Sequence, residues 1–587
     1  MNLVLYRFFS LSIILTSLIL SACNAVYHSE LVKLAKADLV NTSPYLFKLT
    51  KIFPSETYSS VTFDASIIAS PVLDTSQSKL RIIVPISNGM VAGIDAETGA
   101  LDWQISAPTP EGQRAELIST PVVINNKLVI LYQCLDTGVR TSHRLAVIDL
   151  RTKQLDSTFP VLIFAAEQKS VDGKATIKFN PPTAYSHAAL KHIDRADSQY
   201  GFVYAAFGNA GDIQPFHGWF FEIDMDVWQK KGAQQAIRNV LLTTQEAECP
   251  SKMEYGTQEM ICGGGIWVPT GPLISQVENK VEIFIPTGNG QVDLARHDYA
   301  NALMRVKPGL QFDAGCDARL CANFNPLKPD PACMTSCRNL FIPRLAAGNA
   351  PIKPPYHECD DKDFWECLAW MDYDLGANTP IKIELKNGRS VLVQAGKDGG
   401  AYLLDAEQLG RQYDRLQIAK LCGSPTDLCK LSWAGMIVTQ PVQTIVDDES
   451  VAIIPTFSAD KTNGAGLVAL KIVLENNQPK FKPFWRFPEG NAPEALQMFR
   501  SHPSFPVLTT HLGHQKEAII WIVDIGAPGT LYGIRAKDGV MVAKQHLQGS
   551  GRQLSMPLIV GNKIYLASIV PNTGKAMIEA YRIASPQ

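Results

Sequence analysis

Short runs of alternating apolar and polar residues, separated by turn signals, cover most of this chain. A proline followed by apolar or β-branched residues recurs eight times: Pro71 ("ASPVL"), Pro121 ("STPVV"), Pro182 ("NPPTA"), Pro272 ("TGPLI"), Pro380 ("NTPIKI"), Pro441 ("TQPVQ"), Pro506 ("SFPVL") and Pro557 ("SMPLI"). Three copies lead into the same tight turn, "INNKL", "VENKV" and "VGNKI", and then into an alternating strand. Asn and Gly suit such turns, and period-2 alternation predicts half-buried strands joined as hairpins.

A second repeated signature closes these units. It is clearest in "GIDAETGALDW" (93–103), with weaker copies in "LLDAEQLG" (403–410) and "GIRAKDG" (533–539). Strand pairs joined at Asp-x-x-Thr-Gly turns, with a tryptophan packing onto the next unit, are typical of propeller blades. The chain is therefore predicted to be all-β, a β-propeller of eight four-stranded blades. Seven blades stay possible, because the copy at Pro182 is poor.

A proline-rich segment between the fourth and fifth units, 311–370, is predicted to be a loop insertion. It contains six cysteines, Cys316, Cys321, Cys333, Cys337, Cys359 and Cys367, which indicate disulfides in an unknown pairing. A zinc site using the first four is the alternative. Cys249 with Cys262, and Cys422 with Cys429, are expected to close local loops. Eleven cysteines follow Cys23, so one is left over, and the isolated Cys134 is the candidate.

The N-terminus has the features of an export signal. One cation, Arg7, precedes the apolar run "FFSLSIILTSLIL", which is too short to span a bilayer, and "LSAC" ends at Cys23. Small residues before a cysteine match a bacterial lipobox; a plain secretory signal is the alternative. We expect a lipoprotein signal peptide over 1–22, a lipid anchor at Cys23 with a linker over 23–59, and the propeller over 60–587. Asn24 favours the outer membrane, facing the periplasm.

Charge and motifs exclude two function classes. The chain has 54 basic and 56 acidic residues and no basic stripe, so nucleic-acid binding is not expected. It contains no C-x-x-C-H motif, so no c-type haem is expected.

Four stretches stand out around the predicted centre of the ring: "GGGIW" (263–267), "PTGNG" (286–290), "WMDYDLGA" (370–377) and "AGKDGGAYLLD" (395–405). Together with the blade pattern from about residue 60 to 583, they resemble the quinoprotein alcohol dehydrogenases. These are propellers that hold pyrroloquinoline quinone (PQQ) and calcium on the axis. Non-catalytic propellers share the blade pattern, among them the lipoprotein of the outer-membrane β-barrel assembly machinery.

The resemblance implies a role for each stretch. Trp267 would lie beneath the quinone, with Gly263, Gly264 and Gly265 allowing close backbone approach. Asn289 would bind calcium, together with Asp212 of "GNAGDIQPFHGW". Asp374 would be the catalytic base, with Asp372 as the alternative in the same motif. Lys397 would bind the quinone oxygens.

The sequence also departs from the family pattern. Trp267 comes one residue early, Asp212 replaces a glutamate, His217 stands where arginine is expected, and no two cysteines are adjacent to form the ring that covers the quinone. Purely structural roles are the alternative for each residue: Trp267 in a core or between blades, Asn289 and Lys397 in tight turns, Asp372 and Asp374 in a solvated loop.

Three functions follow. The first is a PQQ- and calcium-dependent dehydrogenase that oxidises an alcohol and passes electrons to a separate acceptor. The second is a non-catalytic scaffold that binds another envelope protein. The third is a polysaccharide-binding propeller, suggested by the aromatic residues Phe364, Trp365 and Trp370 of the insertion.

Overall fold

The fold is known from a computed structural model. It describes residues 47–76, 78–209, 216–245, 263–277, 280–290, 292–325, 329–344, 373–419, 437–456, 466–489, 498–499, 501–510, 517–526, 528–552 and 555–584. Among these residues, no helix is long and apolar enough to cross a membrane.

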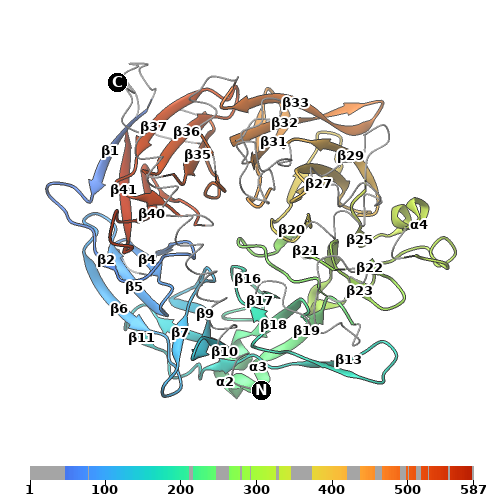
Figure 1. The fold of residues 1–587 in the computed structure, drawn as a ribbon, viewed down its shortest axis with the longest axis horizontal. Helices are drawn as coiled ribbons and strands as arrows, with labels where there is room; N and C mark the ends of the chain where they lie inside the picture. Colours follow the sequence, from blue (N-terminus) through green and yellow to red (C-terminus); the bar gives the residue numbers. More distant parts are fainter. Residues whose placement is uncertain are drawn as a thin grey trace, which may run out of the picture.

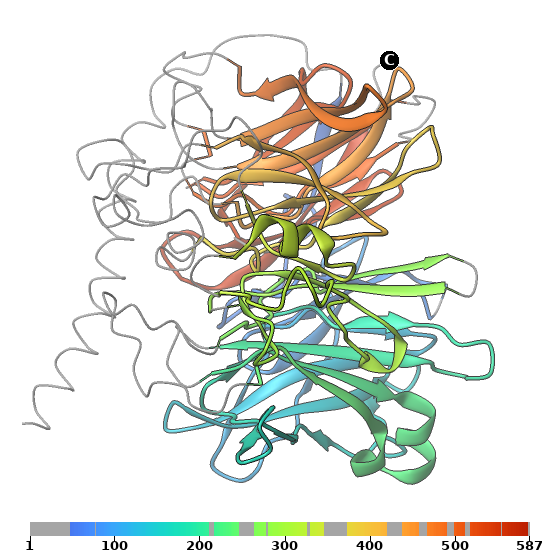
Figure 2. The same ribbon diagram turned by 90° about the vertical axis from the view of Figure 1, so that its right-hand side faces the viewer.

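Eight antiparallel sheets follow one another around a common axis and form an eight-bladed β-propeller (Figure 1). The prediction of eight blades rather than seven is confirmed. Seen from the side, the blades of the green-to-orange half of the chain succeed one another along the ring (Figure 2).

The first four blades contain these strands. Blade 1 has β3 (Val72–Asp74), β4 (Arg81–Pro85), β5 (Met90–Asp95) and β6 (Leu101–Ser106); blade 2 has β7 (Arg114–Glu116), β8 (Val122–Ile124), β9 (Lys127–Asp136), β10 (Val139–Asp149), β11 (Gln154–Leu155) and β12 (Leu162–Ile163); blade 3 has β15 (Ala184–Tyr185), β16 (Lys191–Ile193), β17 (Phe202–Asn209), β18 (Trp219–Asp224) and β19 (Ile237–Leu242); blade 4 has β20 (Leu273–Val277), β21 (Lys280–Pro286), β24 (Leu303–Val306) and β25 (Leu340–Phe341).

The second half of the ring is more regular. Blade 5 has β26 (Ile381–Glu384), β27 (Ser390–Ala395), β28 (Gly400–Asp405) and β29 (Gln412–Gln417); blade 6 has β30 (Val442–Val446), β31 (Glu449–Thr456), β32 (Gly466–Glu475) and β33 (Gln478–Phe487); blade 7 has β34 (Val507–Thr509), β35 (Ile519–Asp524), β36 (Thr530–Arg535) and β37 (Met541–His546); blade 8 has β38 (Ser550–Gly551), β39 (Leu558–Val560), β40 (Lys563–Ile569), β41 (Ala576–Ala584), β1 (Lys48–Phe53) and β2 (Thr62–Phe63).

Smaller elements lie between the blade strands. They are the hairpins β13 (Glu167–Lys169) with β14 (Thr176–Lys178) and β22 (Val292–Asp293) with β23 (Asp298–Tyr299), and the short helices α2 (Met225–Lys231), α3 (Ala233–Ala236), η1 (Pro308–Leu310) and α4 (Pro331–Ser336).

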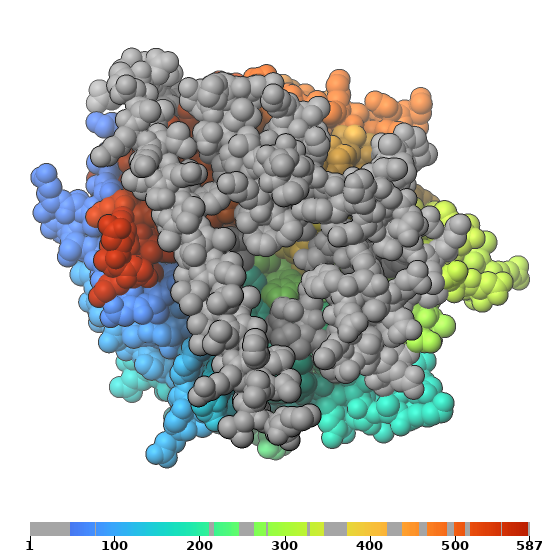
Figure 3. Space-filling model, viewed as in Figure 1, coloured from blue at the N-terminus to red at the C-terminus, as the bar shows by residue number. Residues whose placement is uncertain are grey.

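Blade 8 closes the ring with both parts of the chain. Strand β1 pairs antiparallel with β41, from Lys48 opposite Ala584 to Phe53 opposite Ala580. The blue and red segments accordingly lie next to each other on the rim (Figure 3). Strand β1 lies within the segment 23–59, which was predicted to be an anchor and linker, so the propeller begins before residue 60.

Seven of the eight repeated prolines directly precede the innermost strand of their blade, where a missing N–H costs no ladder bond. Residues beside these prolines connect neighbouring blades through hydrogen bonds: Met556 N to Ser70 Oγ (2.9 Å), Ser70 N to Thr120 Oγ1 (2.9 Å), Leu190 N to Thr120 O (3.0 Å), Ala189 N to Pro269 O (3.2 Å) and Thr270 Oγ1 with Thr379 Oγ1 (2.9 Å). We call this set of contacts the inner ring.

Blade 3 is the exception. Pro182 lies before the short strand β15, whereas the inner strand of this blade is β16, which begins at Lys191 without a proline. Leu190 stands at the position that a proline has in the other blades, directly before the inner strand. Its N–H donates to Thr120 O, which is one of the contacts of the inner ring. The poor sequence match at Pro182 therefore reflects a real change in this blade.

The predicted interblade tryptophan contacts are also present. Trp103 on β6 belongs to an apolar cluster that joins Val91 of blade 1 to Leu128 of blade 2. Trp485 on β33 packs on Gly539 of blade 7, where a Cβ would lie 2.8 Å from its ring, and donates to Ala536 O at 2.9 Å. Indole rings thus hold consecutive blades together.

The cysteine-rich segment differs from its prediction in position. Its described strand, β25, pairs with β24 at the outer edge of blade 4. The first part of segment 311–370 therefore lies inside blade 4 and not between blades 4 and 5. A strand of only two residues leaves no alternating pattern to reveal this.

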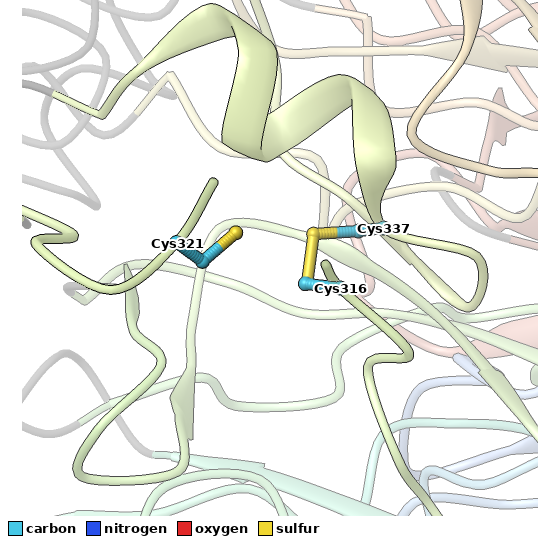
Figure 4. Close-up of side chains that lie close together, drawn as sticks. All are labelled: Cys316, Cys321 and Cys337. Carbon is cyan, nitrogen blue, oxygen red and sulfur yellow. A yellow bond between two sulfur atoms is a disulfide. The ribbon is translucent and has the colours of Figure 1, made fainter. Parts of the chain in front are cut away.

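Two disulfides hold this segment, and we call residues 316–337 the stapled segment. Cys321 bonds Cys333. Cys316 bonds Cys337 beside α4 (Figure 4). The sulfurs of Cys316, Cys321 and Cys337 lie within 4.8 Å of one another. Zinc needs thiolates, and these sulfurs are oxidised, so the zinc alternative is wrong here.

Of the other cysteine predictions, the one for Cys134 is confirmed and the remaining ones fall on residues outside the description. Among the described cysteines, Cys134 is the free one, as predicted, and it is buried on β9. Cys249, Cys262, Cys359, Cys367, Cys422 and Cys429 lie outside the described residues.

The stapled segment docks on the turn between β28 and β29 of blade 5. Leu409 N donates to Arg338 O (3.0 Å), Gly410 N to Cys337 O (2.8 Å) and Gln408 Nε2 to Thr335 O (3.0 Å). Its outward position on the rim is visible at α4 (Figure 1). It fastens blade 4 to blade 5.

Replacing Cys321 and Cys333 together with alanine is expected to lower the free energy of unfolding by about 2–4 kcal/mol, because the unfolded chain regains loop freedom. Hydrogen exchange of the Leu409 and Gly410 amides should also accelerate, since their acceptors lie in or next to the stapled segment. Urea unfolding and exchange mass spectrometry measure the two effects. Unchanged exchange at these amides would contradict the docking role.

Candidate functional site

The predicted site residues gather at one end of blades 3, 4 and 5. In an antiparallel blade, the end of the second strand and the start of the first lie at the same end of the sheet. Asn289 follows the second strand β21, and Lys397 follows the second strand β27. Trp267 and Asp374 precede the first strands β20 and β26.

Three glycines bring the "GGGIW" stretch against the end of β21. Gly264 N donates to Asn289 O at 2.7 Å, and Gly288 N donates to Gly265 O at 2.8 Å. A Cβ on Gly263, whose φ is +111°, would lie 2.1 Å from Asn289 O. Close approach of two backbones, more than turn formation, therefore requires glycine here.

The indole of Trp267 is half-buried and held by its surroundings. Its Nε1 donates to Asn209 Oδ1 at 3.2 Å. A Cβ on Gly208 would lie 3.2 Å from Cδ2 and Cε2 of the indole, so glycine at 208 leaves room for the ring. The rings of Tyr185 and His187 lie 5.5 and 6.3 Å from it. Asn209 and Tyr185 were not predicted as site residues.

Two asparagines provide buried amide groups beside Gly288. Asn289 is 5% exposed, and Asn301 is fully buried with its N–H donating to Gly288 O at 2.7 Å. Within the described part of the chain, Oδ1 and Nδ2 of Asn301 have no hydrogen-bond partner. A buried amide without a partner is costly, and amide oxygens are ligands for calcium.

Asp374 and Lys397 form a buried ion pair. Lys397 Nζ lies 2.9 Å from Asp374 Oδ2, and these side chains are 15% and 2% exposed, respectively. Asp374 Oδ1 accepts from Gly376 N at 2.7 Å, and Lys397 N donates to Asp374 O at 3.0 Å. A Cβ on Gly376 would lie 2.5 Å from Gly288 N. The pair is thereby packed directly against the stretch that carries Asn289.

A second buried charge pair supports the turn that contains Lys397. Arg415 Nη2 lies 2.5 Å from Asp398 Oδ2, the Tyr402 hydroxyl donates to the same oxygen at 2.7 Å, and Gln417 Nε2 donates to Asp398 O at 2.8 Å. Asp398 and Arg415 are almost fully buried, as is Tyr402. Burial, and then the Asp398 charge, raise the pKa of the Tyr402 hydroxyl.

Two histidines border the site in neutral form. Burial, and then the charge of Lys397, lower the pKa of His502 to about 3. Burial lowers the pKa of His217 to about 4, and its Nδ1 lies 2.9 Å from Thr244 Oγ1. His217 also forms a parallel bridge with Gly263, which places it beside the glycines. His502 has no sequence pattern that could have identified it.

Of the predicted site residues, Trp267, Asn289, Asp374, Lys397 and the three glycines lie in one connected group. Asp212 and Asp372 lie outside the described residues, as does Cys23. The described arrangement can offer amide and carboxylate oxygens to a cation, an ammonium to an anion, and an indole to an apolar ring.

No protein-family model matches the chain, and no curated protein matches it. Solved structures with a similar fold include a europium-containing methanol dehydrogenase (12% identity, TM-score 0.50, covering 91% of this chain and 93% of that one). They also include the quinohemoprotein alcohol dehydrogenase ADHIIG from Pseudomonas putida HK5 (12%, 0.45, 90% and 76%) and BamB from Moraxella catarrhalis (12%, 0.43, 91% and 99%). At these identities the likeness concerns the fold.

Proposed function

We propose that the site on blades 3 to 5 binds a planar, carboxylated quinone of the PQQ type together with calcium, in a dehydrogenase that oxidises an alcohol. The observation that carries the proposal is the buried Asp374–Lys397 pair, packed through Gly376 and Gly288 against the stretches of Asn289 and Trp267. A carboxylate, an ammonium, buried amides and an indole converge there from three blades.

The donor set fits calcium. Asn289 and Asn301 supply amide groups, and Asp374 supplies a carboxylate, which are oxygen donors that calcium prefers. Trp267 would lie against the quinone ring, held in orientation by Asn209. The quinone, when bound, supplies a two-electron acceptor for the alcohol.

This chain's own residues would orient the substrate and move its proton. Asp374 Oδ2 would accept the proton of the alcohol hydroxyl as general base. Lys397, fixed at 2.9 Å from that oxygen, would hold the carboxylate in place and bind an oxygen of the quinone. The support from Asp398 and Arg415 would keep Lys397 in position.

The test is calorimetric titration of the purified, lipid-free protein with PQQ in the presence of calcium. We expect calcium-dependent binding that Lys397→Met weakens at least tenfold, because a charge-assisted hydrogen bond contributes about 1.5–3 kcal/mol. Trp267→Ala should weaken it as well, through loss of ring contact.

Lys544→Met is the matched control, since Lys544 is a half-buried lysine on the outer strand β37, distant in the fold from this site. It should bind as the unmodified protein does. Absence of binding heat in the unmodified protein with calcium would contradict the proposal.

The runner-up is a non-catalytic scaffold of the cell envelope, anchored by lipid at Cys23 in the outer membrane. The outward position of the stapled segment favours it, because this segment offers an exposed, disulfide-fixed surface (Figure 1). Cross-linking in intact envelopes, comparing the protein with and without residues 316–337, tests it. A partner captured only with the segment present supports the scaffold; identical capture patterns contradict it.

A further inference from the structure

The inner strand of blade 3 begins with a residue unlike its counterparts. The first residues of the other seven inner strands are all aliphatic: Val72, Val122, Leu273, Ile381, Val442, Val507 and Leu558. Blade 3 has Lys191 there. This position follows the inner ring directly, so an ammonium replaces an apolar side chain close to the axis of the propeller.

The stem of Lys191 is fixed by blade 4. A Cβ on Gly271 would lie 2.6 Å from Lys191 Cε and 3.1 Å from its Cγ, so glycine at 271 makes room for the lysine. The preceding residue, Leu190, is tied to Thr120 of blade 2 by a hydrogen bond of 3.0 Å. Three blades thus fix the position of this one side chain.

The ammonium lies outside the hydrogen bonds and ion pairs made by the described residues. No hydrogen bond or ion pair reaches Lys191 Nζ from the described residues, and the facing Tyr204 donates its hydroxyl to Glu222 at 2.8 Å. Burial lowers the pKa of Lys191 to about 8, and no charged group of the described residues contributes to the shift. Lys191 is half-buried, so its stem is held by the surrounding blades while a small ligand can still reach its ammonium.

We propose that Lys191 is an oxyanion-binding residue at the inner ring, where it binds a carboxylate or phosphate group of a small ligand. A lysine ammonium offers three donors and a full charge, the chemistry that recognises such groups. The site does not depend on the quinone proposal, because none of the residues assigned to that site takes part.

The first experiment follows the lysines in the full protein after reductive methylation with ¹³C-formaldehyde, using NMR without quinone or calcium. Lys191 should titrate near pH 8 in anion-free buffer, and its pKa should rise by about one unit with saturating inorganic phosphate or oxalate. A response to phosphate alone identifies a phosphate-bearing ligand, and a response to oxalate alone a carboxylate. If neither anion moves the Lys191 signal, the proposal is wrong.

The second experiment compares variants by thermal shift in the same two anions. Lys191→Met should lose at least tenfold in anion affinity, while Lys191→Arg should retain most of it. Lys191→Met should fold, and in anion-free buffer it should melt at or above the temperature of the unmodified protein, as the seven aliphatic counterparts imply. Lys544→Met should leave the anion response unchanged; equal anion binding by Lys191→Met would overturn the proposal.

Discussion

Replacing Arg415 with methionine should lower the free energy of unfolding by about 3–5 kcal/mol, because it leaves the carboxylate of Asp398 buried without a cation. The loss should exceed that of most surface substitutions, since Arg415 is 1% exposed and Asp398 fully buried. Urea unfolding monitored by tryptophan fluorescence measures it.

The double variant Arg415→Met/Asp398→Leu separates charge from packing. Removing both charges should restore much of the lost stability, because a buried ion pair contributes little compared with apolar residues of similar volume. If Arg415→Met alone costs less than about 1 kcal/mol, Asp398 is not isolated from water. The supporting role assigned to this pair would then be wrong.

Acid should destabilise the protein at pH values where most of its carboxylates are still ionised. Burial lowers the pKa of His143 and His502 to about 3, whereas an unfolded histidine titrates near 6.5. Between these values the unfolded chain binds more protons, so stability rises with pH and is lost as pH falls below 6.5. From pH 7 to 5, the two histidines together should cost about 4 kcal/mol.

Asp524 acts in the opposite direction. Burial raises its pKa to about 6, so the fold holds a proton that the unfolded chain releases above its own pKa of 3.8. Its contribution is present at low pH and is lost as pH rises through about 6, which offsets about 1 kcal/mol of the acid loss at pH 5. Burial also lowers the pKa of His187 and His217 to about 4, which adds about 2 kcal/mol each over the same range. The net expected loss from these groups is therefore about 6–7 kcal/mol.

Urea midpoints at pH 7 and pH 5 measure this loss, and His143→Leu tests its origin. His143 is fully buried against Phe179 and Phe207, so a leucine should remove about 2 kcal/mol of the difference between the two pH values. His297→Leu, at an exposed position, is the matched control and should leave the difference unchanged. Equal differences in His143→Leu and the unmodified protein would contradict the assignment.

Local chemistry made most of the fold predictable. A proline before an aliphatic run suits the inner edge of a blade. In the "IDAETG" turn, Asp95 accepts from Glu97 N and Thr98 N at 2.9 and 2.8 Å, so the residues that form the turn are neighbours in the sequence. The same sequence patterns did not predict strands whose pairing partner is distant in the sequence, or strands that are very short. Strand β1 finds its partner only at the other end of the chain, and β25 is two residues long.

The site was predictable where glycines mark close backbone contacts. "GGGIW", "PTGNG" and "DLGA" do meet, through Gly264, Gly288 and Gly376. The partners of buried charges were not predictable. Strand register and the connections between blades bring Arg415, His502 and Asn209 to the site. A short stretch of sequence does not show which distant residues these will be.

The closing strand makes completion of the ring depend on residues that are far apart in the sequence. Ser60 Oγ donates to Ile578 O at 2.7 Å across 518 positions of sequence, and β1 pairs with β41 along most of its length. During synthesis, β1 must wait with an unpaired edge until β41 has emerged, and such edges invite pairing with other chains. The interval between the synthesis of β1 and that of β41 is therefore the period in which the chain is most exposed to wrong pairing.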